Sequence, residues 1–237
     1  MSPKKKALVV TGGSQGIGRA IIGKFLQEEW AAFNLSRRPC DCSGVINIAT
    51  DLSSIKNLQD VAHVFSLTDW TVFDRICLVH NAADYLAGSV LSLDVERFKA
   101  SLDTNLFSPI LLNQYFAPKM QSGSSIIYMG STLSEKAVPG AAPYIMAKHV
   151  LLGLMRSSCQ DFVGSGIHSV LVCPGPTDTQ MLREHAGGLA KLEQLAALNA
   201  FSRLLKPEEI ADIVCFSANS PALNGAVVHA NLGERQV

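Results

Sequence analysis

Two residues one helical turn apart could carry acid–base chemistry in this chain of 237 residues. Tyr144 and Lys148 are four positions apart in a stretch that predicts a helix, so the phenol and the ammonium share one helix face. A phenol exchanges protons poorly at neutral pH, because its ordinary pKa is about 10. We expect the nearby ammonium to favour the phenolate and to lower that pKa. The same pair also arises by chance in many helices, so the surrounding sequence has to show whether this pair is catalytic.

Two polar residues upstream supply that context. The apolar run Ser125–Met129 is followed by Gly130 and Ser131, and Ser131 lies thirteen residues before Tyr144. Ligands of wound α/β sheets bind at the carboxyl ends of strands, where the Ser131 hydroxyl could hold a substrate carbonyl oxygen. Asn105 lies in the preceding helical pattern, where its amide could order a water next to the lysine. The alternatives are an ordinary turn serine and a polar residue inside a helix.

The elements that must position these residues alternate along the whole chain, with short apolar runs that predict strands and longer periodic stretches that predict helices. Strands are expected at Ala7–Val10, Ala31–Leu35, Val45–Ile48, Ile76–Val79, Ser125–Met129, His168–Cys173 and Ala226–Ala230. Helices are expected at Gly16–Glu29, Ile55–Ser66, Val95–Met120, Tyr144–Phe162 and Pro207–Asn219. Continuous apolar strands are typical of parallel sheets that are covered on both faces. The sequence therefore predicts an α/β fold, a doubly wound parallel sheet (Rossmann fold) of about seven strands with helices on both faces.

We expect residues 1–237 to form a single domain, since no linker or repeat divides them. One segment stands out, because residues 177–202 follow a predicted strand and carry an amphipathic stretch of their own. An insertion at the carboxyl end of a strand is where a substrate lid would lie. An ordinary surface helix is the other interpretation of these residues.

Composition excludes several classes of protein. Hydrophobic residues make up 48% of the chain and charged residues 17%, which excludes a disordered chain. Twenty basic residues balance twenty acidic ones, so no overall charge would attract nucleic acid or a membrane surface. No apolar run approaches the ~18 residues needed to cross a bilayer. Six scattered cysteines and no signal-like start indicate a reduced, cytoplasmic protein, and the cysteine and histidine spacing predicts no metal site.

A glycine-rich turn joins the first strand to the first helix, with the sequence Thr11-Gly12-Gly13-Ser14-Gln15-Gly16-Ile17-Gly18. Glycines here permit a tight turn, close approach of a phosphate and close packing of helix on sheet. The free N–H groups at the helix start can then receive a pyrophosphate.

The end of the second predicted strand bears on which cofactor binds. An acidic residue there would bind a ribose 2′-hydroxyl, but this chain has Ser36-Arg37-Arg38. A guanidinium can grip a 2′-phosphate and a hydroxyl can donate to it. We therefore predict NADP(H) over NAD(H), with a solvated basic turn as the alternative.

Together these residues resemble the short-chain dehydrogenase/reductase family in its single-domain form. Thr11–Gly18 matches the family's cofactor loop, and the family's catalytic four are matched by Asn105, Ser131, Tyr144 and Lys148. The resemblance alone implies further cofactor contacts, at Asp51 and Leu52 near the adenine, Asn81, Ala82 and Ala83 after the fourth strand, and Pro174, Gly175, Thr177 and Thr179 along the nicotinamide. The chain departs from the family pattern at His80, Ala83 and the segment Ala230–Gly233, where Asn, Gly and Asp-Gly-Gly are usual.

The resemblance implies a reversible carbonyl–alcohol conversion in which NADPH delivers hydride and Tyr144 acts as general acid and base. It implies that Ser131 positions the carbonyl oxygen, Lys148 binds the nicotinamide ribose and lowers the pKa of the phenol, and Asn105 links the lysine to a water chain. The apolar loop 84–93 and the lid favour a small, largely uncharged ketone or aldehyde. The segment 176–181 is also similar, over a few residues only, to sepiapterin and benzil reductases.

Family members commonly pair two long helices across a dimer face, so a homo-oligomer (dimer or tetramer) is expected. The alternative is that the lid and loop cover those helices within a monomer. A non-catalytic NADP(H)-binding regulator on the same fold is the competing function, although it would be expected to lack one of the catalytic four. A sugar-nucleotide epimerase or dehydratase would need a longer C-terminal substrate domain.

Overall fold

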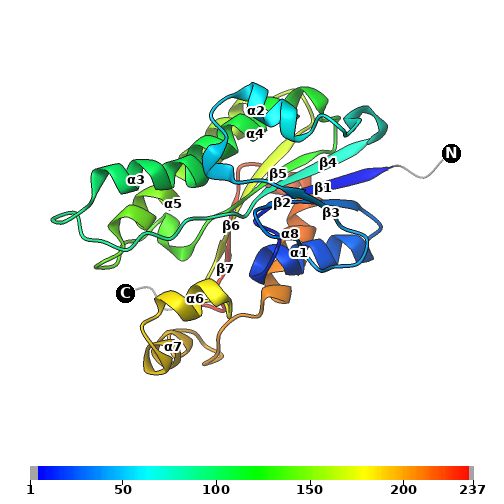
Figure 1. Cartoon of the computed structure of the whole chain (residues 1–237). Helices are drawn as coiled ribbons and strands as arrows, with labels where there is room; N and C mark the ends of the chain where they lie inside the picture. Colours follow the sequence, from blue (N-terminus) through cyan, green and yellow to red (C-terminus); the bar gives the residue numbers. More distant parts are fainter. Residues whose placement is uncertain (1–4, 235–237) are drawn as a thin grey trace.

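A seven-stranded parallel sheet forms the centre of the computed structural model, which describes residues 5–234 (Figure 1). Its strands lie in the order β3-β2-β1-β4-β5-β6-β7. Their bounds are β1 Lys6–Thr11, β2 Ala31–Ser36, β3 Ile46–Ala49, β4 Arg75–His80, β5 Ser125–Met129, β6 His168–Pro174 and β7 Val227–Ala230. The predicted strands and the wound α/β fold are confirmed. The chain runs outward on both sides of the β1–β4 pair, which leaves a switch point between their carboxyl ends.

Helices cover both faces of the sheet, as the sequence predicts (Figure 1). The helices are α1 Gly16–Gln27, α2 Leu58–Val64, α3 Val95–Leu102, α4 Ser108–Phe116, α5 Ala142–Asp161, α6 Gln180–His185, α7 Leu189–Ala196 and α8 Pro207–Ala218. One core cluster packs α1 and α8 against the sheet. The other packs α2, α4 and α5 against the opposite face and is rich in aromatic rings, among them Phe65, Trp70 and Phe116.

The predicted continuous helix 95–120 is wrong in one respect. Between α3 and α4 the chain forms a wide π-helical turn, Asp103–Phe107, and after α4 it ends in a 3-10 turn, Ala117–Lys119. Pro109 explains the wide turn, because a proline has no N–H to donate to the carbonyl of Asn105 four positions earlier. Such single wide turns within helices are frequent at functional sites.

The segment 177–202 contains α6 and α7, which project away from the sheet (Figure 1). Its two ends are joined by a short parallel bridge between Thr177 and Leu205. Leu205 donates to the carbonyl of Pro176 and accepts from the amide of Asp178, at 2.9 and 2.8 Å. Across residues 5–234, no helix combines the length and the apolar character needed to cross a membrane.

Candidate active site

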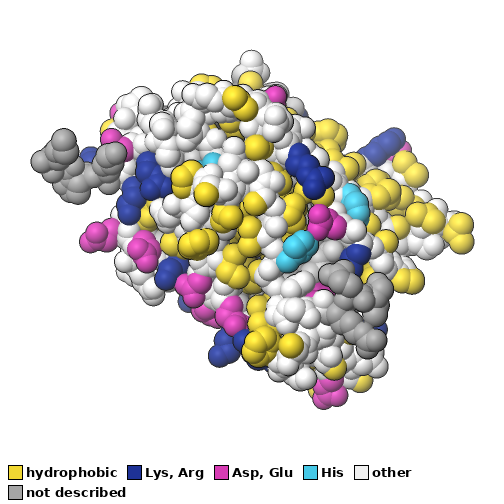
Figure 2. All heavy atoms as spheres, turned by 180° about the vertical axis from the view of Figure 1, so that it is seen from behind, with side chains coloured by type: hydrophobic (Ala, Val, Ile, Leu, Met, Phe, Trp, Pro, Cys, Tyr) yellow, Lys and Arg dark blue, Asp and Glu magenta, His cyan; other side chains and the backbone are white. Residues whose placement is uncertain are grey.

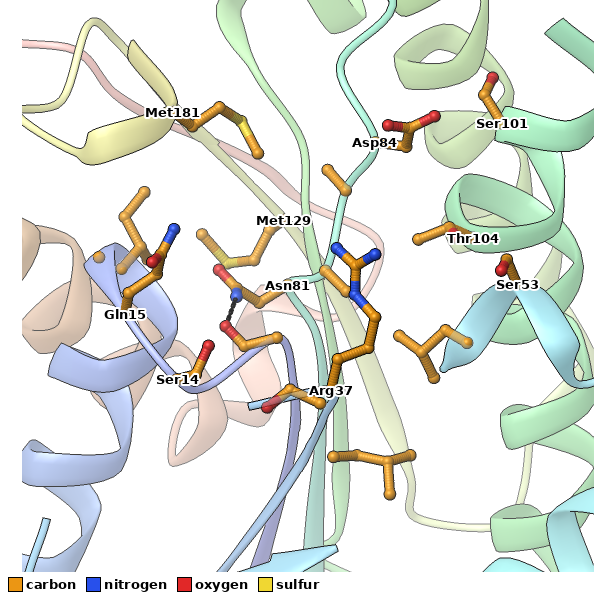
Figure 3. A pocket seen from close by; sticks show the side chains of 18 of the residues that line it. Ser14, Gln15, Arg37, Ser53, Asn81, Asp84, Ser101, Thr104, Met129 and Met181 are labelled. Carbon is orange, nitrogen blue, oxygen red and sulfur yellow. Dashed lines mark hydrogen bonds between the residues drawn. The ribbon is translucent and has the colours of Figure 1, made fainter. Parts of the chain in front are cut away.

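A cavity of about 550 Å³ opens at the carboxyl ends of the strands, at the switch point of the sheet (Figure 3). One wall is the glycine-rich turn between β1 and α1, and another is α3 with the wide turn that follows it. Most residues predicted to touch the cofactor line this cavity, namely Gly12, Ser14, Gln15, Gly16, Ile17, Ser36, Arg37, Arg38, Asp51, Leu52, Asn81, Ala82, Pro174 and Thr179. Tyr144 and Lys148 line the same cavity.

The glycine turn is fixed to the end of β4 by Thr11 and Asn81. The Thr11 hydroxyl accepts from the amides of Asn81 and Ala82 at 3.0 Å, and the Asn81 side chain donates to the carbonyls of Thr11 and Gly12, also at 3.0 Å. A side chain at Gly18 would have its Cβ 2.4 Å from the Gly12 carbonyl oxygen. Gly18 therefore lies behind the cavity wall and permits the close packing that shapes the turn.

The two arginines after β2 differ in whether their guanidinium groups are hydrogen-bonded to the rest of the described chain. Arg37 extends into the cavity (Figure 3) and makes no hydrogen bond or ion pair with the rest of residues 5–234. Arg38 donates to the Gln15 side-chain oxygen at 2.6 Å. The Ser36 hydroxyl is directed at the Asn34 side-chain oxygen and the Arg38 carbonyl, 3.0 and 2.5 Å away. Of these three residues, Arg37 is therefore the one whose donors are all available to a ligand.

Asp51 and Leu52 form the cavity wall that follows β3. The Asp51 carboxylate accepts from the Ser53 amide and hydroxyl at 3.0 and 2.8 Å, which caps the 3-10 turn Leu52–Ser54. The hydrogen bond from the Ser53 hydroxyl lowers the pKa of Asp51, and the charge of Arg37 lowers it further. Asp51 is therefore anionic at neutral pH and partly offsets the charge of Arg37.

Tyr144 is half-buried near the start of α5. Burial raises the pKa of its phenol to about 12, and the hydrogen bond with the Ser131 hydroxyl offsets part of that increase. The expectation that Lys148 lowers this pKa is wrong for this structure, because desolvation of the phenolate outweighs the other influences. The phenol is therefore protonated at neutral pH.

Lys148 is buried beside it, with its ammonium 5.5 Å from the centroid of the Tyr144 ring. Its ammonium donates to the Met129 carbonyl at 2.7 Å. Burial lowers the pKa of Lys148 to about 8, so the group exchanges protons close to neutral pH. One helical turn thus brings a protonated phenol and an amine to the same cavity wall.

Ser131 and Asn105 lie just behind the cavity wall. The Ser131 oxygen accepts from the Leu133 amide at 3.1 Å, so the serine caps the short 3-10 turn that follows β5. The buried Asn105 side chain accepts from the amide of Asp84 and donates to its carbonyl, at 3.0 and 2.9 Å. Asn105 therefore holds the loop after β4 in place, a structural role that its position in a helix did not reveal.

Gly175 and Thr177 also lie behind the wall. A Cβ at Gly175 would be 2.9 Å from Cα of Asn231, and the buried Thr177 hydroxyl donates to the Gly175 carbonyl at 2.9 Å. Asn231 belongs to the segment 230–233 that departs from the family pattern, so the departure leaves this close contact in place.

Several residues of the cavity were missed by the sequence analysis: Thr50, Ser53, Arg97, Ala100, Ser101, Thr104, Met129 and Gly130. The spacing of Arg97, Ser101 and Thr104 at i, i+4 and i+7 on α3 and the wide turn could have indicated a polar helix face. Thr50 left no comparable signal, although its hydroxyl is buried with no hydrogen-bond partner among residues 5–234.

A buried chain of hydrogen bonds connects the strand and helices around the site. His80, at the end of β4, lies 2.7 Å from the Asn113 side-chain oxygen, and the Asn113 amide donates to the Tyr128 hydroxyl at 2.7 Å. Tyr128 in turn meets the Ser158 hydroxyl at 2.8 Å, and Ser158 donates to the Leu154 carbonyl. Because Asn113 uses its amide for Tyr128, its oxygen has to accept from the ring Nε2–H of His80. The ring Nδ1 then carries the lone pair, and it has no partner within the described chain.

Comparisons with known proteins agree with this geometry. The family model described as "Enoyl-(Acyl carrier protein) reductase" matches residues 13–234. The chain is 29% identical to the bullfrog (Aquarana catesbeiana) "Dehydrogenase/reductase SDR family member 6", over 92% of this chain and 91% of that protein. It is 28% identical to the "Cyclic-di-GMP-binding biofilm dispersal mediator protein" of Escherichia coli K12, over 92% and 91% of the two chains.

Solved structures of short-chain dehydrogenases are also similar to this chain. A variant of a Serratia marcescens short-chain dehydrogenase/reductase superposes with a TM-score of 0.83 at 32% identity, over 97% of this chain and 98% of the other. Two structures similar in fold carry cofactors, BdcA in complex with NADPH (TM-score 0.82, 24% identity, 99% and 97% covered) and 4-hydroxyisoleucine dehydrogenase with NADH (0.80, 22%, 97% and 98%). The chain belongs to the short-chain dehydrogenase/reductase family, whose members are nicotinamide-dependent oxidoreductases.

Proposed function

We propose that this protein reduces a small ketone or aldehyde with NADPH, and that Tyr144 protonates the carbonyl oxygen. The observation that carries the proposal is the placement of the Tyr144 phenol and the Lys148 ammonium on the wall of the cavity that the glycine-rich turn also lines. Reduction needs a proton donor at that point, so a protonated phenol is in the state that the reaction consumes.

The residues around the cavity fit a dinucleotide. At the turn between β1 and α1, a Cβ at Gly12 would be 2.9 Å from Cα of Ala82, so the turn is already as close to β4 as backbone permits. The amides at the start of α1 can receive a pyrophosphate, and Asp51 and Leu52 can flank the adenine. When bound, the reduced nicotinamide supplies the hydride that the carbonyl carbon accepts.

Four residues of this chain are proposed to deliver and replace the proton that the reduction consumes. The Ser131 oxygen accepts from the Leu133 amide and its hydroxyl lies at the Tyr144 phenol, so the serine can hold the substrate oxygen beside the phenol by turning its proton to that oxygen. Tyr144 gives its proton to that oxygen, and Lys148, with its lowered pKa, can help to restore it. The Asn105 side chain is engaged with Asp84, so we assign the link to water to its backbone carbonyl, to which Pro109 cannot donate.

The preference for NADPH over NADH is supported by the free guanidinium of Arg37. Similar structures carry NADH or NADPH, so the fold alone does not choose between them. We expect Arg37→Asp to weaken NADPH binding by tenfold or more and to affect NADH little, because the carboxylate repels a 2′-phosphate. NADH serves as the internal control in a fluorescence titration. Unchanged NADPH affinity in this variant would refute the assignment.

The substrate range is supported by the apolar and aromatic side chains around Tyr144. The ring of Tyr85 lies 4.9 Å from that of Tyr144 and 4.6 Å from that of His185, which belongs to α6. Residues 177–202 are therefore proposed to act as a lid that reaches the catalytic tyrosine through Tyr85. These contacts favour a small, uncharged carbonyl compound.

We also propose that the protein is a homo-oligomer. Apolar side chains are exposed on α5, at the start of α4 and on α8, including Val150, Phe107 and Phe216, which are 43%, 48% and 66% exposed. Figure 2 shows hydrophobic side chains gathered across the middle of one face, with charged groups mainly around them. Mass photometry at sub-micromolar concentration tests the proposal, and a single monomer peak would contradict it. The cytoplasmic location stays a prediction.

The experiment that tests the proposed activity is a panel of carbonyl compounds with NADPH, followed by the loss of reduced-cofactor absorbance. We expect Tyr144→Phe to abolish turnover while NADPH binding persists, because the substitution removes only the phenolic hydroxyl and leaves the ring in place. Tyr115→Phe, which removes a phenol outside the cavity, is the matched control. Turnover retained by Tyr144→Phe would overturn the mechanism.

A non-catalytic NADP(H)-binding regulator is the second candidate, and the E. coli relative shows a member of similar sequence that is named for a mediator role in biofilm dispersal. It predicts NADPH binding without turnover of any carbonyl compound. The same panel separates the two, because the regulator leaves wild type and Tyr144→Phe indistinguishable.

A further inference from the structure

A second cluster of reactive side chains lies outside the cavity, in the connection from β2 to β3. The sulfur atoms of Cys40 and Cys42 and a carboxylate oxygen of Asp41 all lie within 4.8 Å of one another. Among residues 5–234, this is the only such group of three cysteine, histidine or acidic side chains. The sequence analysis predicts no metal site, because it weighed the spacing of cysteine and histidine alone and not the carboxylate between these two cysteines.

We propose that Cys40, Asp41 and Cys42 form a binding site for one thiophilic divalent cation, such as Zn²⁺. Two thiolates and a carboxylate are a ligand set that zinc accepts, with a water as fourth ligand. With metal–sulfur bonds of about 2.3 Å, two thiolates on one tetrahedral ion are roughly 4 Å apart. The observed cluster needs only a small adjustment to reach that spacing.

The two sulfur atoms lie against apolar side chains of the core. Cys40 is 4% exposed, and it packs in the core cluster beneath α1, with Cys42 half-buried against the same cluster. Cysteine thiols are ordinarily protonated at neutral pH, and they bind a metal ion as thiolates. Binding therefore releases two protons, and the added double positive charge is balanced by the two thiolates that form.

Hydrogen bonds already hold the cluster in shape. The Asn47 side chain accepts from the amide of Cys40 at 2.8 Å and donates to its carbonyl at 3.0 Å. Asn34 donates to the same Asn47 oxygen at 2.8 Å, which joins the segment to strand β2. A preorganised backbone lowers the ordering cost of binding.

The Asp41 carboxylate already binds another cationic group, with which a metal ion would have to share it. Its carboxylate accepts from the Arg19 guanidinium at 2.6 and 3.3 Å, and both side chains are largely exposed. An exposed ion pair of this kind is weak, because water and salt screen both charges. Metal–thiolate bonds are much stronger, so the pair does not block the site.

The test uses the reduced full chain and Cd²⁺ as a spectroscopic probe, since cadmium–thiolate bonds absorb in the ultraviolet. We expect one Cd²⁺ per chain, displacement of that absorption by Zn²⁺, and release of two protons per Zn²⁺ into a weakly buffered indicator solution. The double variant Cys40→Ser/Cys42→Ser should lose the absorption. Cys159→Ser, which removes a buried cysteine elsewhere, should keep it.

A second variant covers the case in which the double variant fails to fold. Asp41→Asn changes one exposed side chain and should weaken Cd²⁺ binding by about tenfold, comparable with losses seen on removing groups that support a metal site. Absence of the absorption in reduced wild type would overturn the proposal. So would absorption that persists in the folded double variant, or loss of the two thiols to a disulfide under the reducing conditions of the test.

Discussion

The buried His80 ring gives a prediction about acid stability that can be worked through quantitatively. Burial lowers the pKa of His80 to about 4, from an ordinary value of 6.5, and the hydrogen bond to Asn113 offsets only part of that effect. The folded protein therefore keeps the ring neutral at pH values where the unfolded chain protonates it. Between these two pKa values the unfolded state binds more protons, so the free energy of unfolding falls as the pH falls.

The magnitude follows from the two pKa values. Each pKa unit corresponds to about 1.4 kcal/mol, so lowering the pH from 7 to 5 should cost about 2 kcal/mol through His80 alone. Other groups titrate in the same range, including His168, whose pKa is also lowered by burial. The contribution of His80 therefore has to be isolated by comparison with a variant.

His80→Gln is the matched variant, because the glutamine amide can take the place of the ring Nε2–H as donor to Asn113 and has no proton to gain. Urea unfolding of both proteins at pH 7 and pH 5 gives the four free energies that are needed. We expect the wild type to lose about 2 kcal/mol more than His80→Gln over this interval. Equal losses in the two proteins would refute the reasoning, because they would mean that His80 titrates alike in the folded and unfolded chains.

Two further predictions concern the glycine turn and the hydrogen-bond chain. Gly18→Ala should weaken NADPH binding in a fluorescence titration, because the new Cβ would be 2.4 Å from the Gly12 carbonyl oxygen. Gly23→Ala on the same helix is the control, since no atom lies within 4 Å of its new Cβ. This control should bind NADPH normally and unfold at a slightly higher temperature, because alanine favours the helix more than glycine does. Normal NADPH binding by Gly18→Ala would contradict this view of the turn. Tyr128→Phe should lower the free energy of unfolding by about 1–3 kcal/mol, since it leaves the Asn113 amide without an acceptor, and chemical denaturation measures that loss. A variant as stable as wild type would mean that a water replaces the hydroxyl.

The order and type of the elements could be predicted because the sheet is parallel and buried on both faces. Strands such as Ser125–Met129 are then continuous apolar runs, and their ends agree with the structure to within one or two residues. The helix 95–120 was predicted without its wide turn, because the periodic pattern continues through residues 103–107. Pro109 was the available signal, since it removes the hydrogen bond that an ordinary turn would make there.

The sequence predicted which residues line the site better than it predicted their pKa values and hydrogen bonds. Spacing alone put Tyr144 and Lys148 on one helix face, and both line the cavity. The raised pKa of the phenol depends on how deeply the fold buries it, which spacing does not reveal. The bonds of Asn105 likewise depend on Asp84, which is twenty-one positions away in the chain and adjacent only after folding.

The bridge between Thr177 and Leu205 holds the two ends of the intervening segment together, so that this segment can be exchanged for another. Because the two ends meet at one point, the length of chain between them can change without pulling on β6 or on α8. The entropy of closing a loop also grows only slowly with its length, by about 0.6 kcal/mol for each doubling. Shorter or longer stretches can therefore be grafted between these anchors without disturbing the sheet.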